Sequence, residues 1–183
     1  MFAMLERLDW SILFFIQNNF VTPINNKIML FFTSLGNMGI IWIALTVFFI
    51  LKKKYRRLGI MLLIALIAEL LIGNAVLKNI FQRPRPCWIN HSVKMLVAIP
   101  RDYSFPSAHA FSSFICATVI EKYNKKWGVW AIVLAFLISF SRLYLFVHFP
   151  SDVFTGAVLG IVSGMIVYNV FNKFCEKRNL YND

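Results

Sequence analysis

The chain has 183 residues, of which 59% are apolar and 16% aromatic, and its formal net charge at pH 7 is +11. Soluble domains contain about 45–50% apolar residues, so this composition excludes a chain that hides its apolar surface in a core of its own. A bilayer has to solvate part of that surface. The positive charges stand in short clusters between apolar runs, which indicates membrane association and no nucleic-acid partner.

Six apolar segments follow one another along the chain and predict an all-α fold. The first, 5–20, contains polar residues near its end, so we expect a helix in the membrane interface or, alternatively, a short first span. Five further segments are candidate spans: 28–51, 58–77, 107–121, 127–147 and 153–172. The third of these is short, because a spanning helix needs about 20 residues. Its start should therefore lie in a recess below the membrane surface.

The chain contains no repeat, no low-complexity linker and no sign of a second domain. We therefore expect a single membrane-embedded domain over 1–183, built as an integral-membrane bundle of five to six helices. Residues 1–25 hold the N-terminal helix and residues 26–175 the helical core. The three cysteines have no spacing typical of a disulfide framework or a zinc site, so we expect three unpaired thiols.

Lys and Arg residues are distributed unevenly between the two ends of the predicted bundle. The loops 51–57 and 122–127 and the C-terminal segment carry more of them than the opposite face. Because cytoplasmic loops are enriched in Lys and Arg, these loops should face the cytoplasm. The loop 78–106 and the turn 147–152 should then face outward in a multi-pass protein of the plasma membrane.

Three polar clusters fall at the outward ends of these helices: 78–86, 104–109 and 141–152. Ionisable groups near a membrane are functional candidates by default. Lys78, Arg85 and Arg142 supply three positive charges, and guanidinium groups match the geometry of phosphate oxygens. Ser107 and the backbone N–H of Ala108 stand at a predicted helix N-terminus, which favours an anion. The clusters therefore predict a phosphate site on the outer face.

Two histidines suit the two halves of a phosphoryl-transfer reaction. His148 precedes Asp152 by four residues, so the carboxylate can hold one ring nitrogen and direct the other at phosphorus. His109 can protonate the leaving oxygen and then activate the water that breaks the phosphohistidine. A neutral nucleophile and a protonated acid predict a bell-shaped pH profile. No carboxylate cluster of the kind that holds Mg²⁺ accompanies them, so we expect no metal and no cofactor.

These clusters resemble the three-part signature of the type-2 phosphatidate phosphatase superfamily, also called lipid phosphate phosphatases. The first part, K-x6-R-P, fits 78–86, whereas Arg83 has the wrong spacing for its arginine. The second, P-S-G-H, is present at 106–109 with Ala in place of Gly. The third, S-R-x5-H-x3-D, is present at 141–152. The three motifs stand in the right order and at helix ends, so the resemblance is specific.

The resemblance implies that His148 is the nucleophile, Asp152 its orienting carboxylate and His109 the acid and base. It also implies a set of phosphate-binding residues: Lys78, Arg85, Ser107, Ala108 and Arg142. Ala108 keeps the backbone N–H of the usual Gly, and the first turn of a helix tolerates Ala, so we expect little loss of anion binding.

The implied reaction is hydrolysis of a lipid phosphomonoester or diphosphate that the outer leaflet presents. Small bacterial members of the superfamily include undecaprenyl-diphosphate phosphatases, so undecaprenyl diphosphate is the expected substrate. Phosphatidylglycerophosphate and lipid A are the alternatives. A function of another class, binding or transport of a lipid phosphate without turnover, would need polar groups along a path through the bilayer. The sequence indicates no particular oligomeric state.

Simpler structural roles remain open for several of these residues. Each of the three basic residues, taken alone, could anchor a helix at the membrane interface. Ser107 could serve only as a helix N-cap, and His148 with Asp152 could be a capping pair. Glu69 lies in the middle of a predicted span, outside the motifs. It has either a protonated or hydrogen-bonded structural role or a function near the lipid chain.

Overall fold

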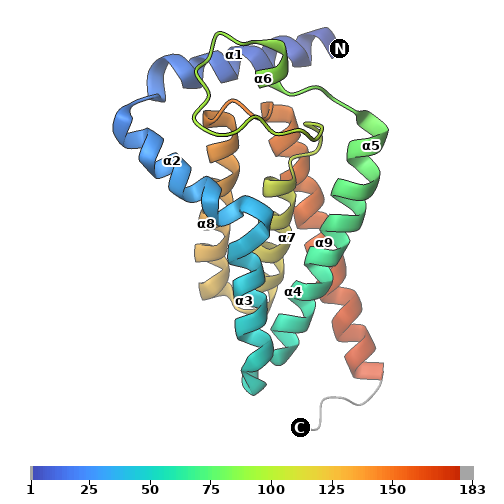
Figure 1. Ribbon diagram of the computed structural model, residues 1–183. Helices are drawn as coiled ribbons and strands as arrows, with labels where there is room; N and C mark the ends of the chain where they lie inside the picture. The colour runs from blue at the N-terminus through green and yellow to red at the C-terminus, as the bar shows by residue number, and fades with distance from the viewer. Residues whose placement is uncertain (1, 178–183) are drawn as a thin grey trace.

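The computed structural model describes residues 2–177, and all secondary structure in that part of the chain is helical (Figure 1). Its α-helices are α1 (Phe2–Phe20), α2 (Pro23–Gly36), α3 (Ile40–Leu51), α4 (Arg56–Glu69), α5 (Lys78–Phe81), α6 (Pro86–Ile89), α7 (Ala108–Tyr123), α8 (Lys125–Tyr144) and α9 (Pro150–Lys177). Three short segments of other helix types complete them: η1 (Asn37–Gly39), η2 (Lys53–Tyr55) and the π-helical η3 (Leu70–Leu77). The predicted all-α bundle is confirmed.

Helix α7 is the central element of the bundle. It packs most extensively against α9 and α8, and it also contacts α4. Its residues from Ala110 to Ile120 are buried, with Phe114 as the one partly exposed position. The helix has 16 residues, which confirms the predicted shortness of this segment. Because its neighbours surround it, α7 does not need the length of a lipid-exposed span.

Four helical stretches are long and apolar enough to cross a membrane: Pro23–Leu51, Lys53–Ile89, Lys125–Tyr144 and Pro150–Lys177. They include four of the five predicted spans, and α7 is the fifth. Large apolar side chains cover their outer surfaces; Phe136 is 60% exposed and Phe154 70% exposed. A surface of this kind suits lipid and not water, so the chain is a multi-pass membrane protein.

Helix α1 lies across one end of the bundle instead of running along it (Figure 1). It packs on α8 and α9 and buries Leu13 and Ile16. Leu8 and Phe15 are about half exposed or more, at 50% and 59%. This arrangement agrees with an interfacial helix and not with the alternative of a short first span.

The predicted span 28–51 contains a kink that the sequence did not indicate. Helices α2 and α3 meet at η1, where Met38 (φ 51°) and Gly39 (φ 68°) both have left-handed backbone conformations. Two such residues in succession interrupt the helical hydrogen-bond ladder. Gly39 adopts this conformation readily, but Met38 is strained there, and such strain concentrates at functional sites.

The second spanning stretch widens in its middle, because η3 is π-helical between α4 and α5. The side chain of Asn74 donates from Nδ2 to Oε1 of Glu69 at 3.0 Å. Single π-helical turns inside α-helices are frequent at functional sites. The buried carboxyl of Glu69 therefore has a hydrogen-bond partner within its own helix, as the structural alternative for this residue requires.

Three glycines of α9, Gly156, Gly160 and Gly164, allow this helix to approach α7 closely. A Cβ atom at Gly160 would lie 2.8 Å from backbone atoms of α7. Small residues at a spacing of four are a common means of close helix packing in membranes. This contact fixes the relative position of two helices whose first turns both carry predicted site residues.

We expect Gly160→Val to destabilise the protein, because the added side chain pushes α9 away from the α7 backbone. Overpacking of this kind costs about 1–3 kcal/mol. At roughly 2–4 °C per kcal/mol, the midpoint of thermal unfolding in detergent should fall by several degrees. The control is Val162→Leu, at a 50% exposed position of the same helix, which should leave the midpoint unchanged. An unchanged midpoint in Gly160→Val would contradict the close α7–α9 contact.

Candidate active site

The three polar clusters meet at the end of the bundle that α1 and the loop 90–107 cover (Figure 1). The structure brings together the predicted site residues, each at or next to a helix end: Lys78, Arg85, Ser107, Ala108, His109, Arg142, His148 and Asp152. Most of these polar side chains are buried, and His148 is only 1% exposed. Burial of so many ionisable groups requires that they pair with one another or with a ligand.

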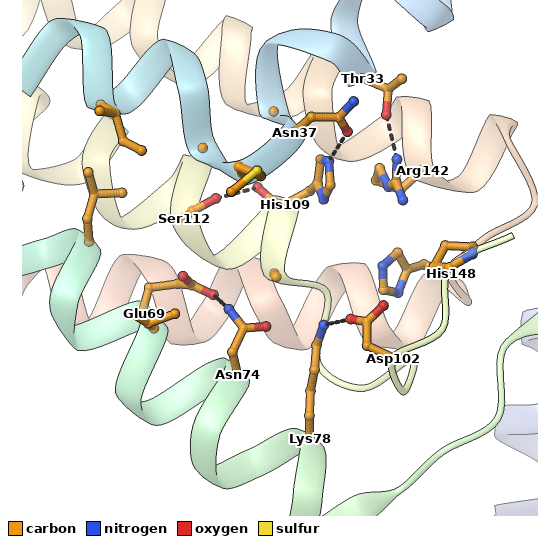
Figure 2. Close-up of a pocket in the computed structure, with 18 of the residues that line it drawn as sticks. Thr33, Asn37, Glu69, Asn74, Lys78, Asp102, His109, Ser112, Arg142 and His148 are labelled. Atoms are coloured by element: carbon orange, nitrogen blue, oxygen red, sulfur yellow. Dashed lines mark hydrogen bonds and ion pairs between the residues drawn. The ribbon is translucent and has the colours of Figure 1, made fainter. Parts of the chain in front are cut away.

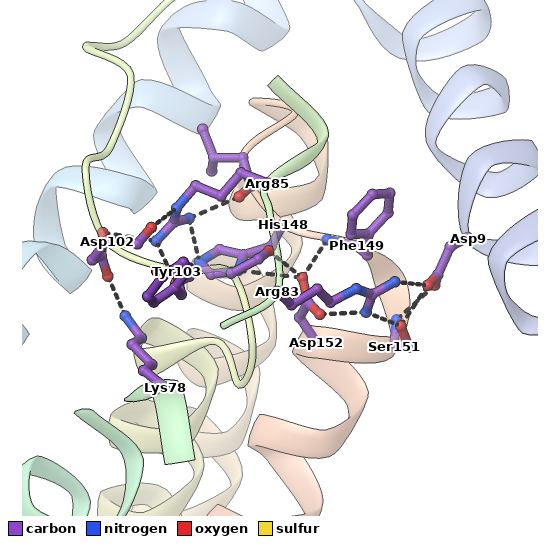
Figure 3. A network of polar contacts seen from close by, with 12 residues as sticks. Asp9, Lys78, Arg83, Arg85, Asp102, Tyr103, His148, Phe149, Ser151 and Asp152 are labelled. Atoms are coloured by element: carbon purple, nitrogen blue, oxygen red, sulfur yellow. Dashed lines mark hydrogen bonds and ion pairs between the residues drawn. The ribbon is translucent and has the colours of Figure 1, made fainter. Parts of the chain in front are cut away.

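The guanidinium of Arg85 joins the loop 90–107 to the α8–α9 turn (Figure 3). Its Nε donates to the backbone oxygen of Asp102 at 2.7 Å, and its Nη2 donates to Oδ1 of the same residue at 2.9 Å. Its Nη1 donates to the backbone oxygen of Val147 at 2.7 Å and lies 3.0 Å from Nε2 of His148. Because a guanidinium only donates, we assign Nε2 of His148 as an acceptor and place the ring proton on Nδ1.

The imidazole of His148 is held in its neutral form. Burial lowers the pKa of His148 well below its usual value of 6.5, and the positive charges of Arg85, Arg142 and Lys78 lower it further. A neutral imidazole with an unprotonated Nε2 is the form that can attack phosphorus. The Nε2 lone pair is directed at Arg85, so an anion bound by this guanidinium would lie next to the nucleophilic atom.

Asp152 lies beside His148, at a distance slightly longer than a hydrogen bond. Its Oδ2 lies 3.6 Å from Nδ1 of His148, too far for a hydrogen bond. The hydroxyl of Ser104, fully buried, contacts both groups. Ser104 Oγ donates to Asp152 Oδ2 at 2.5 Å and lies 3.4 Å from Nδ1 of His148. Ser104 therefore joins the carboxylate and the imidazole, a contact that the motif spacing did not predict.

Asp102 pairs with two of the three cations that the sequence assigned to phosphate. Its carboxylate pairs with Lys78 and with Arg85, although its own side chain is 53% exposed (Figure 3). Burial would raise the pKa of Asp102, but the hydrogen bond from Lys78 and the charge of Arg85 outweigh it and lower the pKa to about 2. The carboxylate is therefore ionised at neutral pH. It stands where the predicted phosphate oxygens would bind.

Two buried donors of the site have no partner. Among the described residues, only three buried side-chain N or O atoms make no hydrogen bond: Ser107 Oγ, Ser139 Oγ and Arg142 Nε. Two of the three belong to predicted phosphate ligands. Buried polar groups are rarely left unpaired unless a ligand, ion or water completes them. Arg142 is otherwise held by Thr33, whose Oγ1 accepts from Nη1 at 2.5 Å.

His109 is held by the kink between α2 and α3, which the sequence did not connect with the site. Its Nε2 lies 3.2 Å from Oδ1 of Asn37 (Figure 2). A Cβ atom at Gly36 would lie 2.6 Å from Cδ2 of the same ring. Ala108 begins α7 without a positive φ, so its replacement of the usual Gly introduces no backbone strain. The kink thus shapes one wall of the site around His109.

A cavity of about 910 Å³ connects these polar groups to an apolar groove (Figure 2). Its polar end is lined by Lys78, Arg85, Asp102, His109, Arg142 and His148. Its apolar end is lined by Met38, Ile43, Leu63, Leu66, Ile67 and Leu70. Glu69 and Asn74 line the same cavity, so a function of Glu69 near a bound lipid chain also remains open. An amphipathic ligand with one anionic end matches this division.

No group of three or more His, Cys, Asp or Glu side chains in the part of the chain that the structure describes could hold a metal ion. The described cysteines, Cys87, Cys116 and Cys175, are unpaired, as predicted.

Comparison with known proteins places the chain in a family. A model of the PAP2 superfamily matches residues 57–175, which contain the whole of the site described above apart from Thr33 and the kink. The chain belongs to the PAP2 superfamily. This confirms the resemblance inferred from the three motifs.

Relatives of this PAP2 protein carry different names, and three of them are compared with it below. An undecaprenyl-diphosphatase of Sulfolobus acidocaldarius is 34% identical over 74% of the chain, which spans only 65% of that protein's own length. A lipid A 4'-phosphatase of Bacteroides thetaiotaomicron is 27% identical, covering 97% of the chain and 83% of the relative. The crystal structure of a transmembrane PAP2 type phosphatidylglycerolphosphate phosphatase from Bacillus subtilis superimposes with a TM-score of 0.74 at 26% identity, covering 95% of the chain and 87% of that structure.

We expect Asp102→Asn to increase the affinity for inorganic phosphate, because it removes an anion that competes for Lys78 and Arg85. One unit charge at about 4 Å in a water-like medium contributes about 1 kcal/mol, or roughly five-fold in Kd. Calorimetric titration of the purified protein with phosphate measures the change. Lys94→Gln, an exposed change in the same loop, serves as the control. Weaker phosphate binding by Asp102→Asn would mean that the carboxylate mainly positions the cations.

Proposed function

We propose that this protein is a membrane lipid phosphatase that hydrolyses a lipid phosphomonoester or diphosphate through a phosphohistidine at His148. The observation that carries the proposal is a buried, neutral imidazole whose Nε2 faces Arg85 at the polar end of a cavity that becomes apolar at its other end. Membership of the PAP2 superfamily supports the same class of reaction.

In the first step, the substrate phosphate replaces the Asp102 carboxylate at the phosphate-binding set: Lys78, Arg85, Arg142, Ser107 and the backbone N–H of Ala108. Nε2 of His148 then forms a bond to phosphorus while the bond from phosphorus to the lipid-side oxygen breaks. His109 donates a proton to that oxygen where the leaving group needs one. The leaving group is a lipid alcohol from a monoester and a lipid monophosphate from a diphosphate.

In the second step, a water molecule attacks the phosphohistidine. His109 takes a proton from this water, the bond between Nε2 and phosphorus breaks, and inorganic phosphate leaves. The fixed cations stabilise negative charge in both transition states. Asp152, acting through Ser104, stabilises the positive charge that His148 carries while it is phosphorylated. This sequence requires no metal or other cofactor.

Undecaprenyl diphosphate, converted to undecaprenyl phosphate, is the proposed substrate. The undecaprenyl-diphosphatase relative supports it by sequence identity, and the apolar part of the cavity suits a long hydrocarbon chain. Phosphatidylglycerophosphate and lipid A are the alternatives, each supported by a relative of that name. Binding or transport without turnover is the outcome that the experiment below must separate from catalysis.

We further propose that the active site faces outward from the plasma membrane and takes its substrate from the outer leaflet. The basic loops at the α3–α4 and α7–α8 connections lie at the end of the bundle opposite to the site (Figure 1). The bias of Lys and Arg toward cytoplasmic loops supports this orientation. In this proposal, the N-terminal helix 1–25 and the core 26–175 form one membrane-embedded domain.

The test is phosphate release by purified protein in detergent with EDTA present, with the three lipids offered in parallel. We expect turnover that survives EDTA and is lost in His148→Ala, together with an acid-labile phosphoryl group on wild-type protein quenched during turnover. The preferred lipid then identifies the substrate. If folded wild-type protein binds the lipids but releases no phosphate from any of them, the protein is a binding or transport protein and the proposal is wrong.

The pH dependence of kcat/KM tests the state of the nucleophile. Protonation of His148 abolishes attack, and its pKa is lowered in the fold, so activity should persist as the pH falls through 6.5 and decline only at more acidic pH. Initial rates at low substrate concentration between pH 4 and pH 9 give the profile. An acidic limb centred above pH 6.5 would contradict a buried, neutral nucleophile.

A further inference from the structure

Arg83, which the motif spacing set aside, bridges two buried carboxylates (Figure 3). Its Nη1 donates to Oδ1 of Asp152 at 2.5 Å and to Oγ of Ser151 at 2.7 Å. Its Nη2 donates to Oδ2 of Asp9 at 2.7 Å. The guanidinium also lies over the ring of Phe149, 4.2 Å from its centre. Two carboxylates, a hydroxyl and an aromatic ring thus hold this cation at the start of α9.

Asp9 is the contribution of α1 to this cluster. It is 2% exposed, although it belongs to a helix that otherwise presents mainly apolar side chains to its surroundings. Besides Arg83, it accepts from the backbone N of Ser151 at 2.9 Å and from Ser151 Oγ at 2.5 Å. The N–H of Ser151 is one of the unpaired donors of the first turn of α9, so Asp9 caps that helix from another element.

The two oxygens of Asp152 have different partners, and the difference defines what Arg83 does. Oδ1 is held by Arg83, whereas Oδ2 accepts from Ser104 and from the backbone N of Phe149. The Arg83 pair therefore fixes the rotation of the carboxylate and keeps Oδ2 on the side of His148. A positive charge beside a buried carboxylate also favours its ionised form, which in turn favours a proton on Nδ1 of His148.

We propose that Arg83 and Asp9 are positioning residues for the His148 nucleophile, acting through Asp152, and that the N-terminal helix is thereby part of the catalytic apparatus. The inference rests on the proposed role of His148 as nucleophile. Neither residue lines the cavity that contains Lys78, Arg85, Ala108, Arg142 and His148. Their contribution lies in the orientation of the imidazole.

Three variants separate positioning from general stability. Arg83→Met removes both ion pairs at similar volume, Arg83→Lys keeps the charge, and Asp9→Asn removes one carboxylate without changing its shape. The matched control is Gln17→Leu. The amide of Gln17 also attaches α1 to the bundle, donating to the backbone oxygen of Tyr144 at 2.8 Å, but it does not touch the Arg83 cluster.

The kinetic readout is kcat, KM and the inhibition constant of inorganic phosphate, with the thermal midpoint measured alongside. Loss of groups that orient a functional ligand typically reduces activity on the order of 10–100-fold. We expect Arg83→Met to lower kcat by this factor, with KM and the phosphate inhibition constant nearly unchanged. Asp9→Asn should lower kcat less, Arg83→Lys should recover part of it, and Gln17→Leu should leave it unchanged.

A second readout does not depend on turnover. The chain has three histidines, so ¹⁵N-histidine spectra, with the His148 signals assigned by their loss in His148→Ala, report its tautomer. We expect the Nδ1–H form in wild-type protein and in both variants, because Arg85 still donates to Nε2, but a changed Nδ1 resonance in Arg83→Met and Asp9→Asn, where the Asp152 carboxylate beside Nδ1 is no longer held in place. This spectrum tests the positioning role even if the wild-type protein hydrolyses no lipid. Absence of hydrolysis would instead count against the proposed function.

Three results would overturn the inference. An unchanged Nδ1 resonance in Arg83→Met would show that Asp152 holds its orientation without Arg83. A weaker phosphate inhibition constant in that variant would make Arg83 a phosphate ligand. An equal loss of kcat in Gln17→Leu, accompanied by a lower thermal midpoint, would reduce the cluster to a general attachment of α1.

Discussion

The buried guanidinium of Arg85 is the contact on which the geometry of the site depends. It is 2% exposed and donates to the loop before α7, to the turn between α8 and α9, and to the imidazole in that turn. These segments are distant in sequence, and single backbone hydrogen bonds also link them: Ser104 N donates to the backbone oxygen of Arg83 at 2.8 Å and Ser107 N to that of Asp152 at 3.2 Å. A planar group with five fixed donors can hold all three in one arrangement, which a lysine ammonium could not do.

Charge balance explains why so many cations can be buried together at the end of an apolar bundle. Lys78 and Arg85 both pair with Asp102. Arg83 pairs with Asp152 and Asp9, which come from two other segments. Arg142 has no such carboxylate and retains an unpaired donor. The site is therefore nearly neutral as a whole but has one guanidinium and one serine hydroxyl whose hydrogen-bonding capacity is incomplete. An incoming oxyanion would accept hydrogen bonds from these two unpaired groups.

Motif spacing was sufficient to predict which residues converge, because each motif ends at a helix terminus on the same face. It was not sufficient to predict the contacts around them. Asn37 reaches His109 only because Met38 and Gly39 turn the chain, and a left-handed methionine leaves no pattern in the sequence. Ser104 and Asp9 reach the start of α9 with side chains from segments that are distant in sequence, and no spacing rule predicts such contacts. Composition predicted an interfacial α1, but it could not show that one carboxylate of that helix reaches the start of α9.

The half-exposed carboxylate of Asp102 has a consequence for how ligands exchange at the site. Two buried cations without an anion would repel each other and would have to recruit water or ions from solution at every release event. With Asp102 at hand, the departing oxyanion is replaced by a resident counterion on the same chain. Arrival and departure then become swaps of one anion for another, in which the local electrostatic potential changes little. A bound oxyanion can thus leave the mouth of the cavity without a replacement being drawn from outside.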